Sequence, residues 1–288
     1  MLDTAVRKTP HFARMALGLM LSLCMGGALS RPASQPGSVV FYYGDQPAER
    51  QLSRFDVAVV EPDTGFVPPV RQGKTHTRWF AYVSVGETSP SRDYYPAIPP
   101  AWIIGRNEEW QAGIMDQTAP GWPDFFVEHV ITPLWNKGYT GFFLDTLDSY
   151  VRVSSDALYQ AQSQAGLVRV IQAIRTKYPA SRLILNRGFE LLPAVHDQVY
   201  AVAFESLFKG WSEADLAYVD VPAEDRAWLR DQARHIMRQY KLPVIAIDYC
   251  PPADRQCATD TIRRIRALGM IPYVGDGRLQ EINTAALD

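Results

Sequence analysis

The stretch GFFLDTLDSY, residues 141–150, runs from an apolar segment directly into Asp145, and a second aspartate, Asp148, follows three positions later. A short, nearly continuous apolar run is typical of a β-strand that is buried on both faces. Alternation along such a strand puts Phe143 and Asp145 on the same face. Aspartate is also common where strands end in solvated turns. The run alone therefore leaves open whether Asp145 is functional or simply ends a strand.

The chain contains seven further runs of this kind, all rich in Val, Ile, Phe and Tyr. They cover residues 39–44, 57–62, 79–87, 182–188, 200–206, 243–250 and 270–276. Amphipathic stretches lie between them, clearest at 156–179 and 223–243, with apolar residues at three- and four-residue spacing. Strands that alternate with helices predict a parallel sheet covered on both faces. Eight such strands fit an α/β protein with one closed (β/α)8 TIM-type barrel over residues 38–288. An open, doubly wound sheet is the alternative, but no GxGxxG motif follows the first run.

The N-terminal segment differs in composition from the rest of the chain. The apolar run MALGLMLSLCMGGAL, residues 15–29, follows three basic residues, which are Arg7, Lys8 and Arg14. This pattern is typical of a secretory signal peptide. An uncleaved membrane anchor is the alternative, and Cys24 leaves lipidation open. We expect a signal peptide or anchor over residues 1–30 and a short linker over 31–37. The mature protein would then be periplasmic or secreted, touching a membrane only through an uncleaved or lipidated N-terminus.

Export would place the remaining two cysteines in an oxidising compartment. Cys250 and Cys257 bracket the segment CPPADRQC. Closely spaced cysteines in an exported protein predict a short-loop disulfide. Two unrelated free thiols are the alternative interpretation. A bridge here would fix one loop rather than the whole fold.

Composition and motifs exclude several functional classes. The formal net charge is −2 and no block of basic residues occurs, which gives no indication of nucleic-acid binding. The five histidines are far apart in the sequence, at His11, His76, His129, His196 and His235. Neither an HExxH motif nor a GxSxG motif is present. We expect no metal site, no cofactor and a monomeric protein.

Polar and aromatic residues gather where the predicted strands end. In a barrel of this type the active site lies at the carboxyl ends of the strands. Acids, amides and aromatic rings are also the groups that bind sugars, since a ring packs on the apolar face of a sugar while polar groups bind its hydroxyls. The residues that we expect to contact substrate at this rim are Tyr43, Glu61, Ser84, Glu87, Trp122, Asp148, Asn186, Arg187, Asp248, Tyr249 and Tyr273. Plain packing is the alternative for each aromatic, and solvation is the alternative for Asp148.

Asp145 and Glu205 stand out because each ends a markedly apolar strand. Alternation places the small residues Ala201 and Ala203 on the same face as Glu205, which suits a crowded barrel interior. A carboxyl group leaving such a strand would be partly desolvated, which raises its pKa and suits a general acid. A less buried partner could stay ionised and attack. Two carboxylates with two roles are the basis of glycoside cleavage. A structural role for one or both is the alternative.

Several of these motifs together resemble a known family. FYYG in the first run, AYVSVGE in the third, GFFLDTLDSY, LILNRG, FES and the closing PYVGD are similar to the polygalactosaminidase barrels. These form glycoside hydrolase family 114 and the related family 166, which includes the hydrolase domain of Pel exopolysaccharide-modifying proteins. The resemblance covers about residues 38–280. It implies a retaining, endo-acting enzyme that cuts α-1,4-linked galactosamine or N-acetylgalactosamine polysaccharide. It also implies Asp145 as the nucleophile and Glu205 as the general acid/base.

Two other functions remain open from the sequence. A carbohydrate-binding barrel without turnover would keep an aromatic-lined groove but misplace the two carboxyl groups. A glycosidase for a different amino-sugar polymer would use the same catalytic groups, and the rim residues do not separate it from the first hypothesis. Carboxyl groups about 5–5.5 Å apart would indicate retention, and a wider separation would indicate inversion.

Overall fold

The computed structural model describes residues 35–69 and 77–287. The predicted signal segment 1–30 lies outside the described residues, as does most of the predicted linker. Eight parallel strands form one sheet in the order β1-β2-β3-β7-β8-β9-β12-β13. These strands are β1 (Val39–Tyr42), β2 (Val57–Val60), β3 (Arg78–Ser84), β7 (Gly141–Asp145), β8 (Arg182–Asn186), β9 (Ala201–Glu205), β12 (Val244–Tyr249) and β13 (Ile271–Gly275). Each matches one predicted run, which confirms the predicted barrel.

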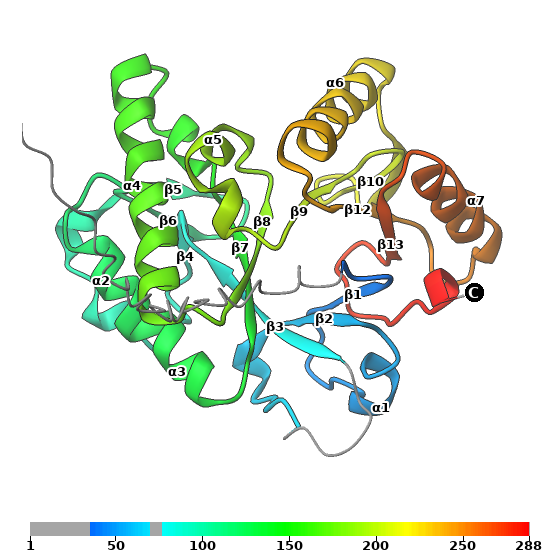
Figure 1. Ribbon diagram of the computed structural model, residues 1–288, viewed down its shortest axis with the longest axis horizontal. Helices are drawn as coiled ribbons and strands as arrows, with labels where there is room; N and C mark the ends of the chain where they lie inside the picture. The colour runs from blue at the N-terminus through cyan, green and yellow to red at the C-terminus, as the bar shows by residue number, and fades with distance from the viewer. Residues whose placement is uncertain (1–34, 70–76, 288) are drawn as a thin grey trace, which may run out of the picture. The chain divides into compact units, whose positions relative to one another are not determined.

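The first and last strands are joined by side-chain and loop contacts rather than by a full ladder. The Tyr273 hydroxyl on β13 donates to the Phe41 carbonyl on β1 at 2.9 Å. Just beyond the strands, the Tyr43 amide donates to the Leu279 carbonyl at 2.7 Å. Figure 1 shows β13 beside β1, with α4, α6 and α7 on the outer side of the strands. The sheet is therefore a nearly closed barrel.

Helices fall where the sequence periodicity predicts them. The longest are α4 (Ala157–Lys177), α6 (Ala223–His235), which continues as a π-helix η8 (Ile236–Tyr240), and α7 (Arg255–Arg266). The Asp156 side chain begins α4 by accepting from the Tyr159 amide at 2.8 Å, which satisfies a donor that a helix start otherwise leaves free. The shorter helical segments are α1 (Glu49–Leu52), η1 (Pro62–Thr64), η2 (Tyr95–Ala97), η3 (Pro100–Trp102), α2 (Trp122–Phe126), η4 (Val127–Ile131), α3 (Thr132–Asn136), η5 (Ser149–Arg152), η6 (Phe189–Leu191), α5 (Leu192–Val195), η7 (His196–Gln198) and η9 (Ala285–Leu287).

Two insertions depart from simple strand–helix alternation. Between β3 and β7, a small antiparallel sheet joins β4 (Glu87–Thr88), β6 (Ala112–Met115) and β5 (Ile103–Asn107). After β9, a hairpin pairs β10 (Lys209–Ser212) with β11 (Ala217–Asp220). The sequence periodicity did not separate these short strands from loops. Both insertions follow the carboxyl end of a barrel strand, so they add side chains to the rim.

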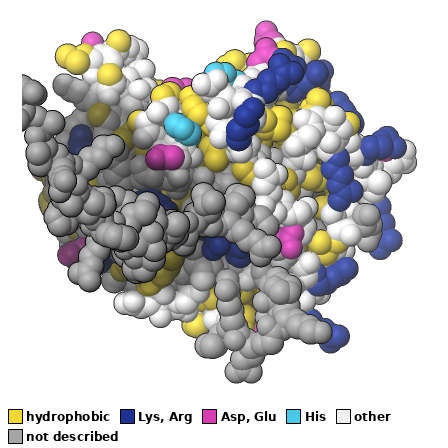
Figure 2. All heavy atoms as spheres, in the orientation of Figure 1, with side chains coloured by type: hydrophobic (Ala, Val, Ile, Leu, Met, Phe, Trp, Pro, Cys, Tyr) yellow, Lys and Arg dark blue, Asp and Glu magenta, His cyan; other side chains and the backbone are white. Residues whose placement is uncertain are grey.

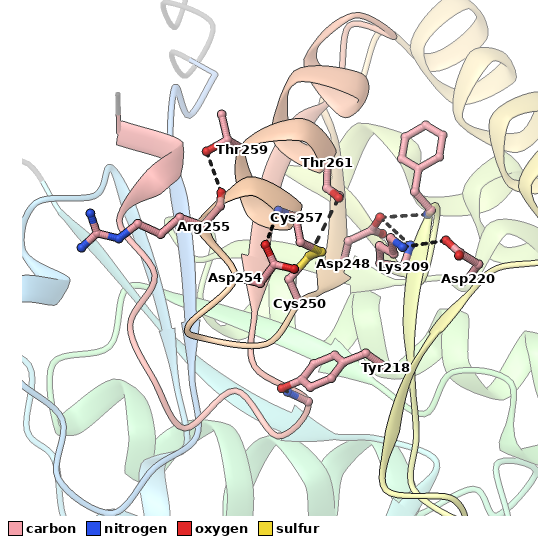
Figure 3. The surroundings of a disulfide bond; sticks show 12 residues. Lys209, Tyr218, Asp220, Asp248, Cys250, Asp254, Arg255, Cys257, Thr259 and Thr261 are labelled. Carbon is pink, nitrogen blue, oxygen red and sulfur yellow. Dashed lines mark hydrogen bonds and ion pairs between the residues drawn. A yellow bond between two sulfur atoms is a disulfide. The ribbon is translucent and has the colours of Figure 1, made fainter.

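Cys250 and Cys257 form a disulfide, as predicted. Figure 3 shows that the bond joins the end of β12 to the first turn of α7. The Asp254 carboxylate accepts from the Cys257 amide at 2.9 Å and so caps the same turn. Cys250 is buried in a small apolar cluster with Ala258, Ile262, Val274 and Ala286. The disulfide therefore fixes the loop that directly follows Tyr249.

The outer helices carry much of the positive charge seen on one face. In Figure 2, Lys and Arg side chains gather on the side where α6 and α7 lie in Figure 1.

Within the described part of the chain, no helix is both long enough and apolar enough to cross a membrane.

Candidate active site

A cavity of about 740 Å³ opens at the carboxyl ends of the barrel strands. Among the described residues, its lining includes the acids Glu61, Glu87, Glu109, Asp145, Glu205 and Glu213 and the arginines Arg92, Arg152, Arg187 and Arg278. Asp145 and Glu205 therefore face the same space, although β7 and β9 are not adjacent strands. The lining carries more carboxylates than guanidinium groups, so the cavity favours cationic ligands.

Asp145, the last residue of β7, is held by donors from both neighbouring strands. The Tyr82 hydroxyl on β3 donates to Asp145 Oδ2 at 2.7 Å, and Asn186 Nδ2 on β8 donates to Oδ1 at 2.7 Å. These bonds follow from the topology, because β7 lies between β3 and β8 in the sheet. Hydrogen-bond donors stabilise negative charge on oxygen. Asp145 is thus oriented as a carboxylate facing the cavity.

Glu205, the last residue of β9, lies in a desolvated setting. Burial, and then the nearby charge of Asp145, raise the pKa of Glu205. Hydrogen bonds from Tyr249 and Asn186 act in the opposite direction without cancelling the effect. A buried carboxyl group with a raised pKa holds its proton to a higher pH than an ordinary glutamate. Glu205 is therefore suited to donating a proton.

Asn186 connects the two carboxyl groups directly. Its Nδ2 donates to Asp145 Oδ1 at 2.7 Å and to Glu205 Oε1 at 3.0 Å. The two accepting oxygens cannot lie farther apart than the sum of these bonds. That sum is shorter than the roughly 6.5–9.5 Å that separates the carboxyl groups of inverting glycosidases. The separation is compatible with the shorter spacing of retaining enzymes.

A left-handed residue follows each of these three strand ends. Thr146 has φ 60°, Arg187 has φ 56° and Ser206 has φ 62°, each directly after Asp145, Asn186 or Glu205. Positive φ is uncommon for residues other than glycine and is strained for a β-branched threonine. The Thr146 hydroxyl, bonded to the Gly86 amide at 2.8 Å, helps to hold this conformation. A Cβ at position 86 would lie 2.0 Å from the Thr146 carbonyl oxygen, so glycine is required there.

The rim above the carboxyl pair is built from ion pairs and aromatic rings. Arg92 makes two bonds to Glu61, at 2.6 and 3.0 Å, and a third to Asp63 at 2.8 Å. Glu87 is buried and accepts from the Asn107 amide at 3.0 Å and from the Ser149 hydroxyl at 2.7 Å. Tyr43 packs against Tyr82 with ring centroids 5.0 Å apart. These contacts fix the walls on the β1–β3 side.

The cavity contains most, but not all, of the predicted site residues. Those that line it are Tyr43, Glu61, Ser84, Glu87, Asp145, Arg187, Glu205 and Tyr249. Asn186 lies beneath the surface, where it bonds both carboxyl groups. Asp148 is exposed and does not line the cavity.

Three residues that were predicted to contact substrate are buried, so that prediction is wrong for them. Trp122, Tyr273 and Asp248 are each 0% exposed, so they offer no surface to a sugar. Trp122 begins α2 and packs against Phe125. Tyr273 lies against Phe41 inside the barrel, with ring centroids 5.6 Å apart. Proximity to the predicted rim in the sequence did not distinguish these packing residues from residues that line the cavity.

Asp248 organises the loop that follows Glu205. Its carboxylate accepts from the amides of Leu207, Phe208 and Lys209 at 2.6, 2.8 and 3.0 Å, and Figure 3 shows Asp248 beside Lys209. Burial raises the pKa of Asp248 to about 6 despite these three bonds. The loop leads from Ser206 into β10, so Asp248 fixes part of the cavity without lining it.

Replacing Asp248 by alanine is expected to lower the free energy of unfolding by about 2–6 kcal/mol, because the buried amides of Leu207 and Phe208 lose their partner and each such N–H group costs about 1–3 kcal/mol. Urea denaturation followed by tryptophan fluorescence measures the change. Asp254→Ala is the matched control, since Asp254 also accepts from a backbone amide but is exposed. That cap is expected to contribute only about 1 kcal/mol. Equal losses in the two variants would contradict the role given to Asp248.

Sequence reasoning missed the residues that the insertions contribute. Glu109 and Trp110 come from the turn between β5 and β6, while Trp211 and Glu213 come from the β10–β11 hairpin. Arg278 follows β13. Because these residues lie outside the barrel strands, a search of strand ends does not find them. The sequence signal that could have identified such cavity residues is a tryptophan that lies within a polar segment.

No group of three or more His, Cys, Asp or Glu side chains within residues 35–69 and 77–287 is arranged to hold a metal ion.

Comparison with known proteins identifies similar chains. Residues 29–287 match the model of glycoside hydrolase family GH114. The glycoside hydrolase domain of PelA from Pseudomonas aeruginosa is 32% identical, with a TM-score of 0.76 over 85% of this chain and 97% of that domain. An uncharacterized protein of Deinococcus radiodurans is 25% identical over 247 residues, which are 80% of this chain and 76% of the relative. Ega3 from Aspergillus fumigatus, solved in complex with galactosamine, shares the fold with 12% identity and a TM-score of 0.59.

Proposed function

Because this chain belongs to glycoside hydrolase family GH114, we propose that it is a retaining, endo-acting hydrolase of α-1,4-linked galactosamine or N-acetylgalactosamine polysaccharide. The observation that carries the proposal is the single Asn186 amide that bonds both Asp145 and Glu205. This shared amide supports the proposal, because both carboxyl groups line one cavity and lie close to each other. Retaining glycosidases need this short separation, because the nucleophile must reach the anomeric carbon directly.

The proposed reaction has two steps. Asp145 attacks the anomeric carbon and forms a glycosyl ester while the glycosidic C–O bond breaks. Glu205 gives its proton to the departing oxygen. In the second step Glu205, now a carboxylate, takes a proton from water, and the resulting hydroxide oxygen displaces Asp145. Two inversions at the same carbon give net retention, and Glu205 ends the cycle protonated as it began.

The cavity supports a substrate that carries amino groups. Two of the four arginines in its lining are paired with carboxylates of the same lining, Arg92 with Glu61 and Arg278 with Glu213. The remaining carboxylates leave an acidic cavity that attracts ammonium groups. The relative PelA is a glycoside hydrolase by its description, and Ega3 was solved with galactosamine. We infer that the protein acts on a galactosamine-containing exopolysaccharide after export.

Product analysis tests the proposal. The purified protein is incubated with α-1,4-linked galactosamine polymer at several degrees of N-acetylation, alongside chitosan and chitin oligomers. Short oligomers from the galactosamine polymer, whose new reducing ends first appear as the α-anomer by NMR, are the expected result. First appearance of the β-anomer would contradict retention. Cleavage of chitosan alone would contradict the proposed sugar, and binding without cleavage would leave only a carbohydrate-binding barrel.

A further inference from the structure

The hairpin β10–β11 carries a tryptophan that is held from several directions. Trp211 faces Tyr218 across the hairpin, with ring centroids 4.9 Å apart. Its indole Nε1 donates to Glu213 Oε2 at 2.7 Å, and Arg278 donates to the other oxygen of Glu213. Both ends of this carboxylate are therefore engaged, and the edge of the indole ring is fixed by a charge-assisted hydrogen bond.

The backbone at Gly277 supports the ring of Trp211. A Cβ built at Gly277 would lie 2.3 Å from Trp211 Cδ2 and 2.6 Å from Cε3. Such close approach is possible only because glycine has no side chain. The Gly277 amide also donates to the Tyr218 hydroxyl at 3.2 Å. The hairpin after β9 and the loop after β13 thus clamp the indole between them.

The clamped indole shares the cavity of the catalytic pair. Trp211, Glu213, Gly277 and Arg278 line the same cavity as Asp145 and Glu205. A half-buried aromatic ring that is already ordered loses little conformational entropy when it binds a ligand. Its exposed surface suits the apolar face of a sugar ring. The contacts that hold the Trp211 ring in place do not by themselves explain why this ring also lines the cavity.

We propose that Trp211 is a preformed platform on which one hexosamine ring of the polymer stacks, next to the ring at which the bond is cleaved. This inference rests on the proposed function, because it assigns a binding subsite within the same cavity. The platform contributes to the binding of longer chains and takes no part in the bond-breaking steps. It therefore predicts an effect on KM that depends on substrate length.

The test compares two routes to losing the platform. Trp211→Ala removes the ring, whereas Gly277→Ala keeps it but displaces it with a methyl group. Each variant is expected to raise KM for galactosamine oligomers of eight or more units by about tenfold, with kcat changed by less than about threefold. An aryl galactosaminide that fills only the catalytic subsite should be affected far less. Gly277→Ala should have no further effect in the Trp211→Ala background.

Trp228→Ala is the matched control, since Trp228 is an exposed tryptophan on α6 that packs against Phe189 and does not line the cavity. It should leave both substrates unchanged. The inference is overturned if the wild type cleaves the oligomers and Trp211→Ala leaves their KM within about twofold. It is also overturned if oligomer and aryl substrate lose activity equally, which would indicate a structural role for the ring.

A direct binding measurement separates the platform from the proposed reaction. If the wild type cleaves no galactosamine polymer, the proposed function fails, and calorimetric titration with the same oligomers tests the platform independently. Weaker binding by Trp211→Ala, together with unchanged binding by Trp228→Ala, would support the subsite. Equal binding by all three proteins would overturn it.

Discussion

Replacing Asp145 by asparagine is expected to lower kcat on the galactosamine polymer by at least about 10⁴-fold, in the range found when an essential member of a catalytic group is removed. Asparagine is nearly the same size and keeps an oxygen that accepts from Tyr82. It has no negative charge to attack the anomeric carbon. The fold should therefore persist while the first chemical step fails. Initial rates of reducing-end release measure the loss, and circular dichroism checks the fold.

Asp156→Asn is the matched control for this substitution. Asp156 caps α4 from an exposed position, and asparagine caps helices about as well as aspartate. This variant should keep full activity. A second measurement identifies the nucleophile: Asp145→Ala with added azide and an aryl galactosaminide should give a glycosyl azide of inverted anomeric configuration. Activity of Asp145→Asn within tenfold of wild type would contradict the assignment.

The barrel was predictable from the sequence because burial and periodicity are local signals. Each apolar run became a strand, and the stretches at 156–179 and 223–243 became α4 and α6 with its π-helical end. The carboxyl ends of parallel strands must meet at one rim. Asp145 and Glu205 could therefore be placed together without any tertiary information.

The remaining parts of the site depended on contacts between distant segments. Asp248 and Tyr249 are the last two residues of β12 and Tyr273 lies in the middle of β13, yet only Tyr249 lines the cavity. Side-chain direction and the path of the next loop decide this difference: Asp248 turns toward the amides of residues 207–209. Trp211 lines the cavity because the β10–β11 hairpin packs against the loop after β13. The sequence contains no periodic signal that predicts this contact between distant segments.

Replacing Glu205 by glutamine is expected to lower kcat on the polymer by about 10²- to 10⁴-fold, the contribution typical of general acid catalysis. The polymer has a poor leaving group that needs a proton. An aryl galactosaminide with a good leaving group needs little such help, so its first step should lose much less activity. Equal losses of kcat/KM, which reports the first step, on both substrates would contradict the acid role. Glu190→Gln, an exposed glutamate on η6, is the matched control.

The pH dependence gives an independent test of Glu205. Only its protonated form can act as the acid, and burial raises its pKa, so kcat/KM should fall as the pH rises through that raised pKa. The Tyr249 hydroxyl donates to Glu205 and acts to lower the pKa. Tyr249→Phe should therefore raise the pKa of Glu205 further and move the alkaline limb of the pH profile of kcat/KM to higher pH. Tyr42→Phe removes a hydroxyl that donates to the Gln46 carbonyl instead, and should not move it. An alkaline limb that stays in place in Tyr249→Phe would show that another group controls it.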